Sequence, residues 1–347
     1  KLISNINSIV KEISNKLGKE KLDIVDGFCG STVVSRSFIK YANKLYTNDL
    51  ELYSYLMSKC FLIRPRKEDI LKIHKHIENM NNIKTFNENG LIYTNYAPKD
   101  MDNIKQDERC FYSTQNAKII DTMNNYINNE VEDHLKHYCL VPLLIKCSIH
   151  TNTSGVFKGF YKNKEGIGCF GGTGKNALSR ILKQIEVEVP IWHDNKVEVK
   201  ASNLDIEQFC KDLPSTDVVY LDPPYNQHPY GSNYFMLNVI ANNKINGDMS
   251  KVSGIPNTWN KSDFNYKQKA KISMMNVLES LKTKTKYVIL SYNNEGIIAD
   301  DDWEEIFKSY TYEKREFDYN TFKGSRNLDQ RSKKVVEILY ILCPKPI

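Results

Sequence analysis

One segment of the chain must lie inside a sheet. Residues 217–221 are almost continuously apolar and stop at Asp222-Pro223-Pro224-Tyr225. A strand of this kind has both faces covered, as in a parallel sheet, because a solvated face would give alternating polar residues. Pro223 and Pro224 lack backbone N–H groups and have a fixed φ, so the chain leaves the sheet in a rigid turn with an exposed carbonyl group. This turn is a candidate functional site, although an Asp beside two prolines is also a common turn former.

The N-terminal part of the chain alternates short strands with helices. We predict helices over residues 2–17, 33–41 and 50–62, the first ended by Gly18, and strands over 22–25 and 44–49. Successive strand-to-helix units indicate a parallel α/β sheet. Further core strands are predicted over residues 196–201, 287–291 and 335–342. The sheet is therefore assembled from both ends of the chain.

The strand-to-helix alternation is interrupted in the middle of the chain. Polar, Asn- and Lys-rich helical pieces and a Gly-rich aromatic stretch over residues 153–175 replace it. We therefore predict an inserted, mainly helical domain over residues 63–190, and a second domain formed by residues 1–62 and 191–347.

Composition favours a folded chain with a modest bias toward polyanion partners, which alone does not establish nucleic-acid binding. The 347 residues are 41% hydrophobic and 26% charged, and 48 Lys and Arg against 42 Asp and Glu give a formal charge of +6. The 8 cysteines form no CxxC pair, so we expect reduced thiols and no metal. No apolar run approaches the ~20 residues of a membrane span, and no signal peptide is apparent. We expect a cytoplasmic protein without a membrane partner.

Two features suggest a cofactor site. The loop Phe28-Cys29-Gly30-Ser31-Thr32 follows the first predicted strand, where backbone approaches a cofactor in Rossmann-like sheets. Glycine is also needed in such turns for geometry alone, and the two explanations are evenly balanced. Asp49 ends the next strand, from which a carboxylate accepts hydrogen bonds from ribose hydroxyls. Capping of the helix that begins at Leu50 is the alternative.

The Asp-Pro-Pro-Tyr turn and the upstream Phe-x-Gly loop together resemble the Dam-like (alpha-group) adenine N6 DNA methyltransferases of restriction–modification systems. The resemblance extends to the end of the second strand, residues 109–127 and 152–157, Tyr230-Gly231-x-Asn233-Tyr234, and residues 291–296. It implies an α/β, class I S-adenosylmethionine-dependent methyltransferase fold with a Rossmann-like sheet and an inserted target-recognition domain. Residues 1–62 and 191–347 would then be the catalytic domain, and residues 63–190 would bind DNA.

The resemblance also implies an activity and its residues. A methyl group would pass from S-adenosyl-L-methionine to N6 of an adenine flipped out of double-stranded DNA, and a cognate restriction endonuclease would be a partner. Asp222 and the Pro223 carbonyl would accept the amine hydrogens in a turn completed by Pro224, and Tyr225 would stack on the base. The implied cofactor residues are Asp26, Phe28, Cys29, Gly30, Ser31, Thr32, Asp49, Leu50, Ser202, Asn203 and Asp222. Those at the DNA or target base are Tyr225, Asn226, Tyr230, Asn233 and Tyr234.

Two departures from the family pattern keep alternatives open. Thr32 stands where the family usually has a second glycine, and a β-branched side chain there would crowd the methionine end of the cofactor. The family's first motif would fall at or before Lys1, which suggests that residues precede it. A DNA-binding protein on this fold that does not methylate is therefore one alternative. Methylation of cytosine N4, RNA or a protein amide is another, although Asp222 favours adenine because Ser or Asn usually stands there in those enzymes.

Three further stretches carry weaker signals. The Gly-rich stretch from Gly171 to Asn176 lacks the spacing of a phosphate-binding P-loop, so a flexible loop near DNA phosphates is the better interpretation. Basic residues 64–67 and 323–326 would grip phosphates or lie on solvated surface. Acidic residues 300–305 predict a helix start without a function.

Overall fold

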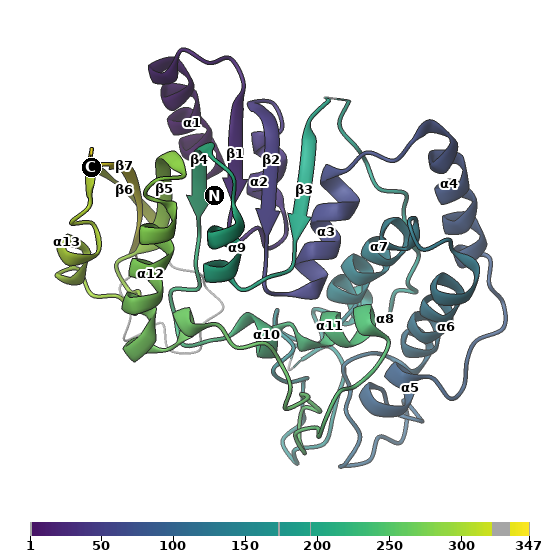
Figure 1. Cartoon of the computed structure of the whole chain (residues 1–347). Helices are drawn as coiled ribbons and strands as arrows, with labels where there is room; N and C mark the ends of the chain where they lie inside the picture. Colours follow the sequence, from purple (N-terminus) through teal and green to yellow (C-terminus); the bar gives the residue numbers. More distant parts are fainter. Residues whose placement is uncertain (1, 173, 195, 321–333, 347) are drawn as a thin grey trace. The chain divides into compact units, whose positions relative to one another are not determined.

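The computed structural model describes residues 2–172, 174–194, 196–320 and 334–346. Thr173 and the basic residues 323–326 lie outside these ranges. The chain forms two compact units, labelled by element in Figure 1. Unit 1 contains Lys1–Ile63, His193–Pro229 and Lys261–Ile347, and unit 2 contains Arg64–Trp192 and Tyr230–Asn260. No helix within the described ranges is long and apolar enough to cross a membrane.

Unit 1 is built on a seven-stranded sheet with the strand order β3-β2-β1-β4-β5-β7-β6. The strands are β1 (Leu22–Asp26), β2 (Ala42–Asn48), β3 (Glu198–Ser202), β4 (Thr216–Leu221), β5 (Thr285–Asn293), β6 (Tyr310–Asn320) and β7 (Lys334–Pro344). Strands β1 to β5 pair in parallel, and β7 pairs antiparallel with both β5 and β6. This order, with its antiparallel β7 beside β5, is the Rossmann-like sheet of class I methyltransferases and confirms the predicted fold class.

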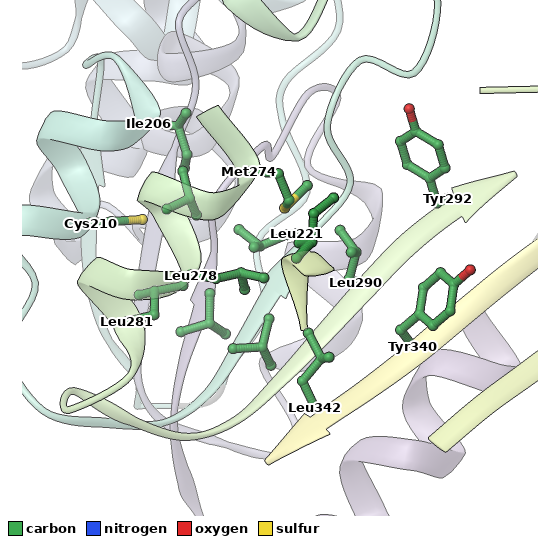
Figure 2. Close-up of a cluster of buried hydrophobic side chains, with 14 of the residues drawn as sticks. Ile206, Cys210, Leu221, Met274, Leu278, Leu281, Leu290, Tyr292, Tyr340 and Leu342 are labelled. Atoms are coloured by element: carbon green, nitrogen blue, oxygen red, sulfur yellow. The ribbon is translucent and has the colours of Figure 1, made fainter. Parts of the chain in front are cut away.

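Helices cover both faces of this sheet. Those of unit 1 are α1 (Ile3–Leu17), α2 (Val33–Phe38), α3 (Leu52–Leu62), α9 (Ile206–Asp212), α12 (Lys267–Leu281) and α13 (Asp302–Ile306), with the short 3-10 helix η1 (Asp263–Asn265). Apolar residues of α1 and α2 pack on one face. Figure 2 shows the core on the other face, where Met274 and Leu278 of α12 meet Leu221 of β4. Consecutive residues of the central strands point into hydrophobic cores on opposite faces of the sheet, which explains why these strands are apolar throughout.

The structure confirms most predicted elements of unit 1 and adds one strand. Helix α1 ends at Gly18, which has a φ of 64° and donates hydrogen bonds to the last helical carbonyls, as the sequence predicted. Strands β1, β2, β3, β4, β5 and β7 all lie at predicted positions. Strand β6 was not predicted, nor was the antiparallel direction of β7. An edge strand such as β6 carries many charged side chains, so it lacks the apolar pattern of a core strand.

Unit 2 is mainly helical. Its helices are α4 (Lys67–Asn81), α5 (Leu91–Tyr96), α6 (Thr114–Glu130), α7 (Lys136–Ile149), α8 (Leu178–Leu182), α10 (Tyr230–Asn233) and α11 (Phe235–Asn242). Unit 2 includes residues 230–260, which the sequence analysis assigned to the catalytic domain. The packing explains the difference, because the buried Phe235 ring lies 5.8 Å from Tyr96 and 6.0 Å from Phe111 between ring centroids.

The Gly-rich stretch of unit 2 is anchored by a buried asparagine. Asn152 Nδ2 donates to the carbonyl oxygens of Cys110 and Cys169, both at 2.8 Å, and its Oδ1 accepts from the Gly171 N–H. Gly171 has a φ of 90°, which favours glycine. This part of the predicted flexible loop therefore has a fixed attachment to the core of unit 2.

Candidate active site

The candidate site lies within unit 1, at the carboxyl ends of β1, β2, β3 and β4. These strands are neighbours in the sheet, and the chain order reverses at β1, because β2 and β3 lie on one side of it and β4 on the other. Ligands of open α/β sheets bind at the carboxyl edge beside such a reversal. Every cofactor residue implied by the sequence follows or ends one of these four strands.

The loop after β1 leaves open space at Gly30. Gly30 has a φ of 49°, and a Cβ built there would meet no atom within 4 Å. Its N–H donates to Asp49 Oδ2 at 2.8 Å, which ties the loop to the end of β2. The Phe28 ring packs edge-on against Phe264, with centroids 5.5 Å apart. The loop is therefore held from two sides while its surface at Gly30 remains accessible.

Alternate side chains of the same loop point inward or outward. Cys29 is buried, with its Sγ 3.1 Å from Ser58 Oγ, and burial raises the pKa of the thiol well above its usual range. Thr32 is fully buried with a φ of 65°, and its hydroxyl has no hydrogen-bond partner among the described residues. Ser31 is exposed. Thr32 thus presents no side-chain atom to the open surface on which a cofactor would lie.

Asp49 joins two backbone segments at the end of β2. Its Oδ2 accepts from the Gly30 N–H, and its Oδ1 accepts from the Glu51 N–H at 2.9 Å. Helix α3 begins at Leu52, with Glu51 as its N-cap residue, so Asp49 is not the helix cap considered from the sequence. Burial raises the pKa of the Asp49 carboxyl. Each carboxylate oxygen can accept a further hydrogen bond, so the carboxylate can still bind hydroxyl groups.

The turn after β3 is fastened to β2 by two asparagines. Asn203 Nδ2 donates to the carbonyl oxygens of Asp49 (2.8 Å) and Leu50 (3.0 Å), while Ser202 O accepts from the Asp49 N–H. Asn48 is buried, and its side chain pairs with the Leu204 backbone N–H and carbonyl, both at 3.1 Å. The structure therefore brings Ser202 and Asn203 beside Asp49, but the Asn203 amide is already used to shape the turn.

Asp26 ends β1 and is almost fully buried, with 1% of its surface exposed. Its Oδ2 accepts a hydrogen bond from Ser35 of α2, whereas its Oδ1 has no partner among the described residues. Burial raises the pKa of Asp26 to about 7 against the opposing bond from Ser35, and the nearby charges of Asp222 and Asp49 raise it further. Three carboxyl groups thus gather at this edge of the sheet. No described group of three or more His, Cys, Asp or Glu residues is arranged to hold a metal ion.

Asp222 follows the fully buried strand β4, yet its side chain is exposed. The surrounding protein raises the pKa of this carboxyl to about 6, mainly by displacing solvent, and the negative charge of Glu337 adds to the effect. Hydrogen bonds with Ser291 and Tyr220 oppose the rise. Pro223 behind it is buried, and Pro224 is half-buried. The turn therefore presents a carboxylate that is ionised at neutral pH and accessible to a ligand.

Tyr225 and Asn226 complete the turn. The half-buried Tyr225 ring packs against the core and lies edge-on to Tyr292, with centroids 6.2 Å apart. The Asn226 side chain is exposed, and its Oδ1 accepts from the His228 N–H at 2.9 Å, which bends the chain. These two residues therefore lie in unit 1 beside Asp222.

The remaining implied DNA residues belong to unit 2. The Tyr230 and Tyr234 rings are stacked, with centroids 5.8 Å apart and an interplanar angle of 17°, and 49% of Tyr230 is exposed. Asn233 O accepts from the Phe157 N–H at 2.7 Å. The bond between Phe157 and Asn233 joins the segment after the Asp222–Tyr225 turn to the Gly-rich stretch, an association that sequence order alone does not reveal.

Sequence reasoning missed four side chains that shape the site: Asn48, Phe264, Asn265 and Tyr292. Asn48 pairs with the Leu204 backbone, and Asn265 Nδ2 donates to the Asn226 carbonyl at 2.8 Å. Bonds between a side chain and the backbone leave no spacing pattern in a sequence. Tyr292 lies in the stretch of residues 291–296, which the sequence analysis included in the resemblance without assigning a role. Gly296, which lies against the Tyr292 ring, is a sequence signal for this close approach.

Comparisons with known proteins identify the family to which the chain belongs. A family model described as D12 class N6 adenine-specific DNA methyltransferase matches residues 3–320. Type II methyltransferase M.NlaIII of Neisseria lactamica is 28% identical over 97% of this chain and 96% of its own length. Modification methylase StsI of Streptococcus sanguinis is 27% identical over 95% of this chain and 48% of its own length. Type II methyltransferase M.CviAII of Paramecium bursaria Chlorella virus 1 is 26% identical over 87% of this chain and 84% of its own length.

The chain thus spans about half the length of StsI and nearly all of M.NlaIII. Among solved structures, TehB from Haemophilus influenzae aligns with a TM-score of 0.35 and 7% identity over 98% of this chain and 62% of that chain. The family match covers far more than half of the sequence and includes every element that forms the candidate site except β7. The chain belongs to the D12 class of N6 adenine-specific DNA methyltransferases.

Proposed function

We propose that the protein transfers a methyl group from S-adenosylmethionine to N6 of adenine at a specific site in double-stranded DNA, as the modification component of a restriction–modification system. The observation that carries this proposal is the exposed Asp222 carboxylate at the end of the buried strand β4, fixed by two prolines. Family membership makes an exocyclic amine in DNA the expected ligand of that carboxylate.

The residues at the carboxyl edge of the sheet fit the cofactor. Open space at Gly30 admits a ligand against the loop backbone, and Asp26 Oδ1, at the end of the preceding strand, is a buried oxygen without a partner among the described residues. The Asp49 carboxylate, at the end of the adjacent strand, is placed to accept hydrogen bonds from ribose hydroxyls. S-adenosylmethionine supplies a methyl group that is already activated by the sulfonium. A strong general base is therefore not required.

The catalytic turn acts by orientation. Asp222, ionised at neutral pH, and the Pro223 carbonyl accept the two hydrogens of the adenine amino group and thereby aim the nitrogen lone pair. Tyr225 stacks on the ring of the base. Holding the reacting groups in line contributes several orders of magnitude to a rate without any new chemistry. The acceptor must leave the DNA stack to reach this turn, so we expect base flipping.

DNA binding is the role that we assign to unit 2. The chain carries a formal charge of +6, and unit 2 displays the stacked Tyr230 and Tyr234 pair with a half-exposed ring. Aromatic faces stack on bases, whereas basic side chains contact phosphates. We place the reaction in the cytoplasm, where DNA and a cognate restriction endonuclease would meet.

Replacement of Asp222 tests this proposal. We expect Asp222→Ala to lower methyl transfer to plasmid DNA by about 100-fold or more, because the amine loses its main acceptor. Calorimetry should show that the variant still binds the cofactor, with a much smaller loss of affinity than of rate, because Gly30 and Asp49 are untouched and Asp222 is only one of the residues implied at the cofactor. Asp301→Ala removes an exposed carboxylate of the same unit, which caps no helix with its side chain, and should keep full activity. Full transfer by Asp222→Ala would refute the mechanism.

A further inference from the structure

The backbone of the catalytic turn is held by two contacts from segments far away in the sequence. Asn265 Nδ2 donates to the Asn226 carbonyl at 2.8 Å, and the Ile297 N–H donates to the Tyr225 carbonyl at 2.9 Å. Two consecutive carbonyl groups of the turn are therefore fixed from outside it. Of these two contacts, the one from Asn265 is made by a side chain and can be removed by substitution.

The residues around Asn265 form a rigid support. Asn265 is 5% exposed and lies in η1, where its N–H donates to the Ser262 carbonyl at 3.1 Å. The preceding Phe264 is 2% exposed and belongs to the core between the sheet and α12. Its ring also packs against Phe28 of the loop after β1. The amide of Asn265 is therefore presented from a fixed turn that contacts both functional loops.

The chemistry of this contact suits a positioning role. A neutral amide donates to a carbonyl without adding a charge next to Asp222, so the carboxylate keeps its ionisation. Asn226 is held at two atoms: its Oδ1 accepts from the His228 N–H, and its carbonyl oxygen accepts from Asn265 Nδ2. Fixing residue 226 restricts the backbone of Tyr225, whose ring would stack on the base. A displacement of ~1 Å at a reacting group lowers a rate by up to about 100-fold.

We propose that Asn265 is a positioning residue for methyl transfer, which acts through the Asn226 carbonyl to hold Tyr225 and Asp222 in register with the target base. This inference rests on the proposed function. Asn265 touches neither the base nor the cofactor in this role, so its removal changes the rate of transfer more than the binding of the cofactor.

Asn265→Leu tests the proposal at similar volume and without adding a charge near Asp222, because leucine has no group that can donate to the carbonyl. We expect the single-turnover rate of methyl transfer to plasmid DNA to fall ~10-fold or more, with cofactor affinity within about threefold of the wild type. Tyr310→Phe is the matched control: it removes another buried side-chain bond to a backbone carbonyl of unit 1, from Tyr310 Oη to Leu278 O. It should lower stability without this selective loss of rate.

Hydrogen exchange provides a readout that does not need activity. In Asn265→Leu, amides of residues 225–228 should exchange at least about threefold faster in the free protein, and in Tyr310→Phe they should not. An unchanged rate and unchanged exchange in Asn265→Leu would overturn the proposal, as would a loss of rate matched by an equal loss of cofactor binding. If the wild type methylates no DNA, the proposed function fails, while exchange still shows whether Asn265 holds the turn.

Discussion

Replacement of Asp26 by asparagine should change how the stability of the protein depends on pH. Asp26 is 1% exposed, and its pKa is raised to about 7, mainly by burial. In the unfolded chain an aspartate titrates near ~3.9. Between these values the folded protein binds a proton that the unfolded chain has released. The contribution of the protonated carboxyl is thus fully present below pH ~4 and is lost as the pH rises to about 7.

The size of the effect follows from the two pKa values. A difference of ~3 units at ~1.4 kcal/mol per unit gives about 4 kcal/mol in total, an order-of-magnitude figure for this buried group. Between pH 5 and pH 7, the free energy of unfolding of the wild type should therefore fall by roughly 2 kcal/mol relative to that of Asp26→Asn. Asparagine does not titrate. Asp49 and Asp222 are present in both proteins, so their own titrations largely cancel.

Urea unfolding at pH 5, 6, 7 and 8, followed by circular dichroism, measures this difference. The comparison uses the slope of the free energy of unfolding against pH. The substitution Asp26→Asn also changes the hydrogen bond from Ser35, but that change is the same at every pH and does not affect the slope. Asp301→Asn is the control, since it replaces an exposed carboxylate of the same unit, and its stability should run parallel to that of the wild type. Parallel curves for Asp26→Asn and the wild type would refute the reasoning about burial.

Two further predictions concern the catalytic turn. Because the pKa of Asp222 is about 6 and we assign the acceptance of an amine hydrogen to its ionised form, methyl transfer should fall about tenfold per pH unit well below pH 6. Initial rates that stay constant from pH 8 to pH 5 would contradict this. Gly296→Ala would place a Cβ 2.1 Å from the buried Tyr292 ring, so we expect a loss of ~1–3 kcal/mol in stability and slower transfer. Thermal unfolding measures the loss against Gly159→Ala, where a Cβ meets no atom within 4 Å, and equal melting temperatures would disprove the clash.

The sequence predicts the fold well where burial is strongest. Strand β4 is buried at every position, so its apolar run and the prolines after it define both the strand and its end. Strand β6 is an edge strand, and the charged residues in its middle part interrupt the apolar pattern that would predict a strand. The antiparallel direction of β7 depends on packing between distant segments, which no local pattern encodes. Residues 230–260 join unit 2 for the same reason, through aromatic contacts of Phe235.

The sequence predicts which strand ends meet at the candidate site, but not the side chains that hold its loops in place. Gly30, Asp49 and Asp222 stand at strand ends, and topology alone brings such positions to one edge of a sheet. The contact of Asn203 with the cofactor stays a prediction, whereas the bonds from its Nδ2 to the Asp49 and Leu50 carbonyls were not predicted. Asn265 was not recognised, because a side chain that binds a backbone carbonyl carries no spacing signature.

The most direct test of the account is the identity of the methylated nucleoside. The protein is incubated with unmethylated DNA and S-adenosylmethionine labelled in its methyl group, and the DNA is digested to nucleosides and separated. The account predicts label on N6-methyldeoxyadenosine. Label on N4-methyldeoxycytidine would contradict the role assigned to Asp222, and absence of label with folded protein and several DNAs would contradict the activity itself.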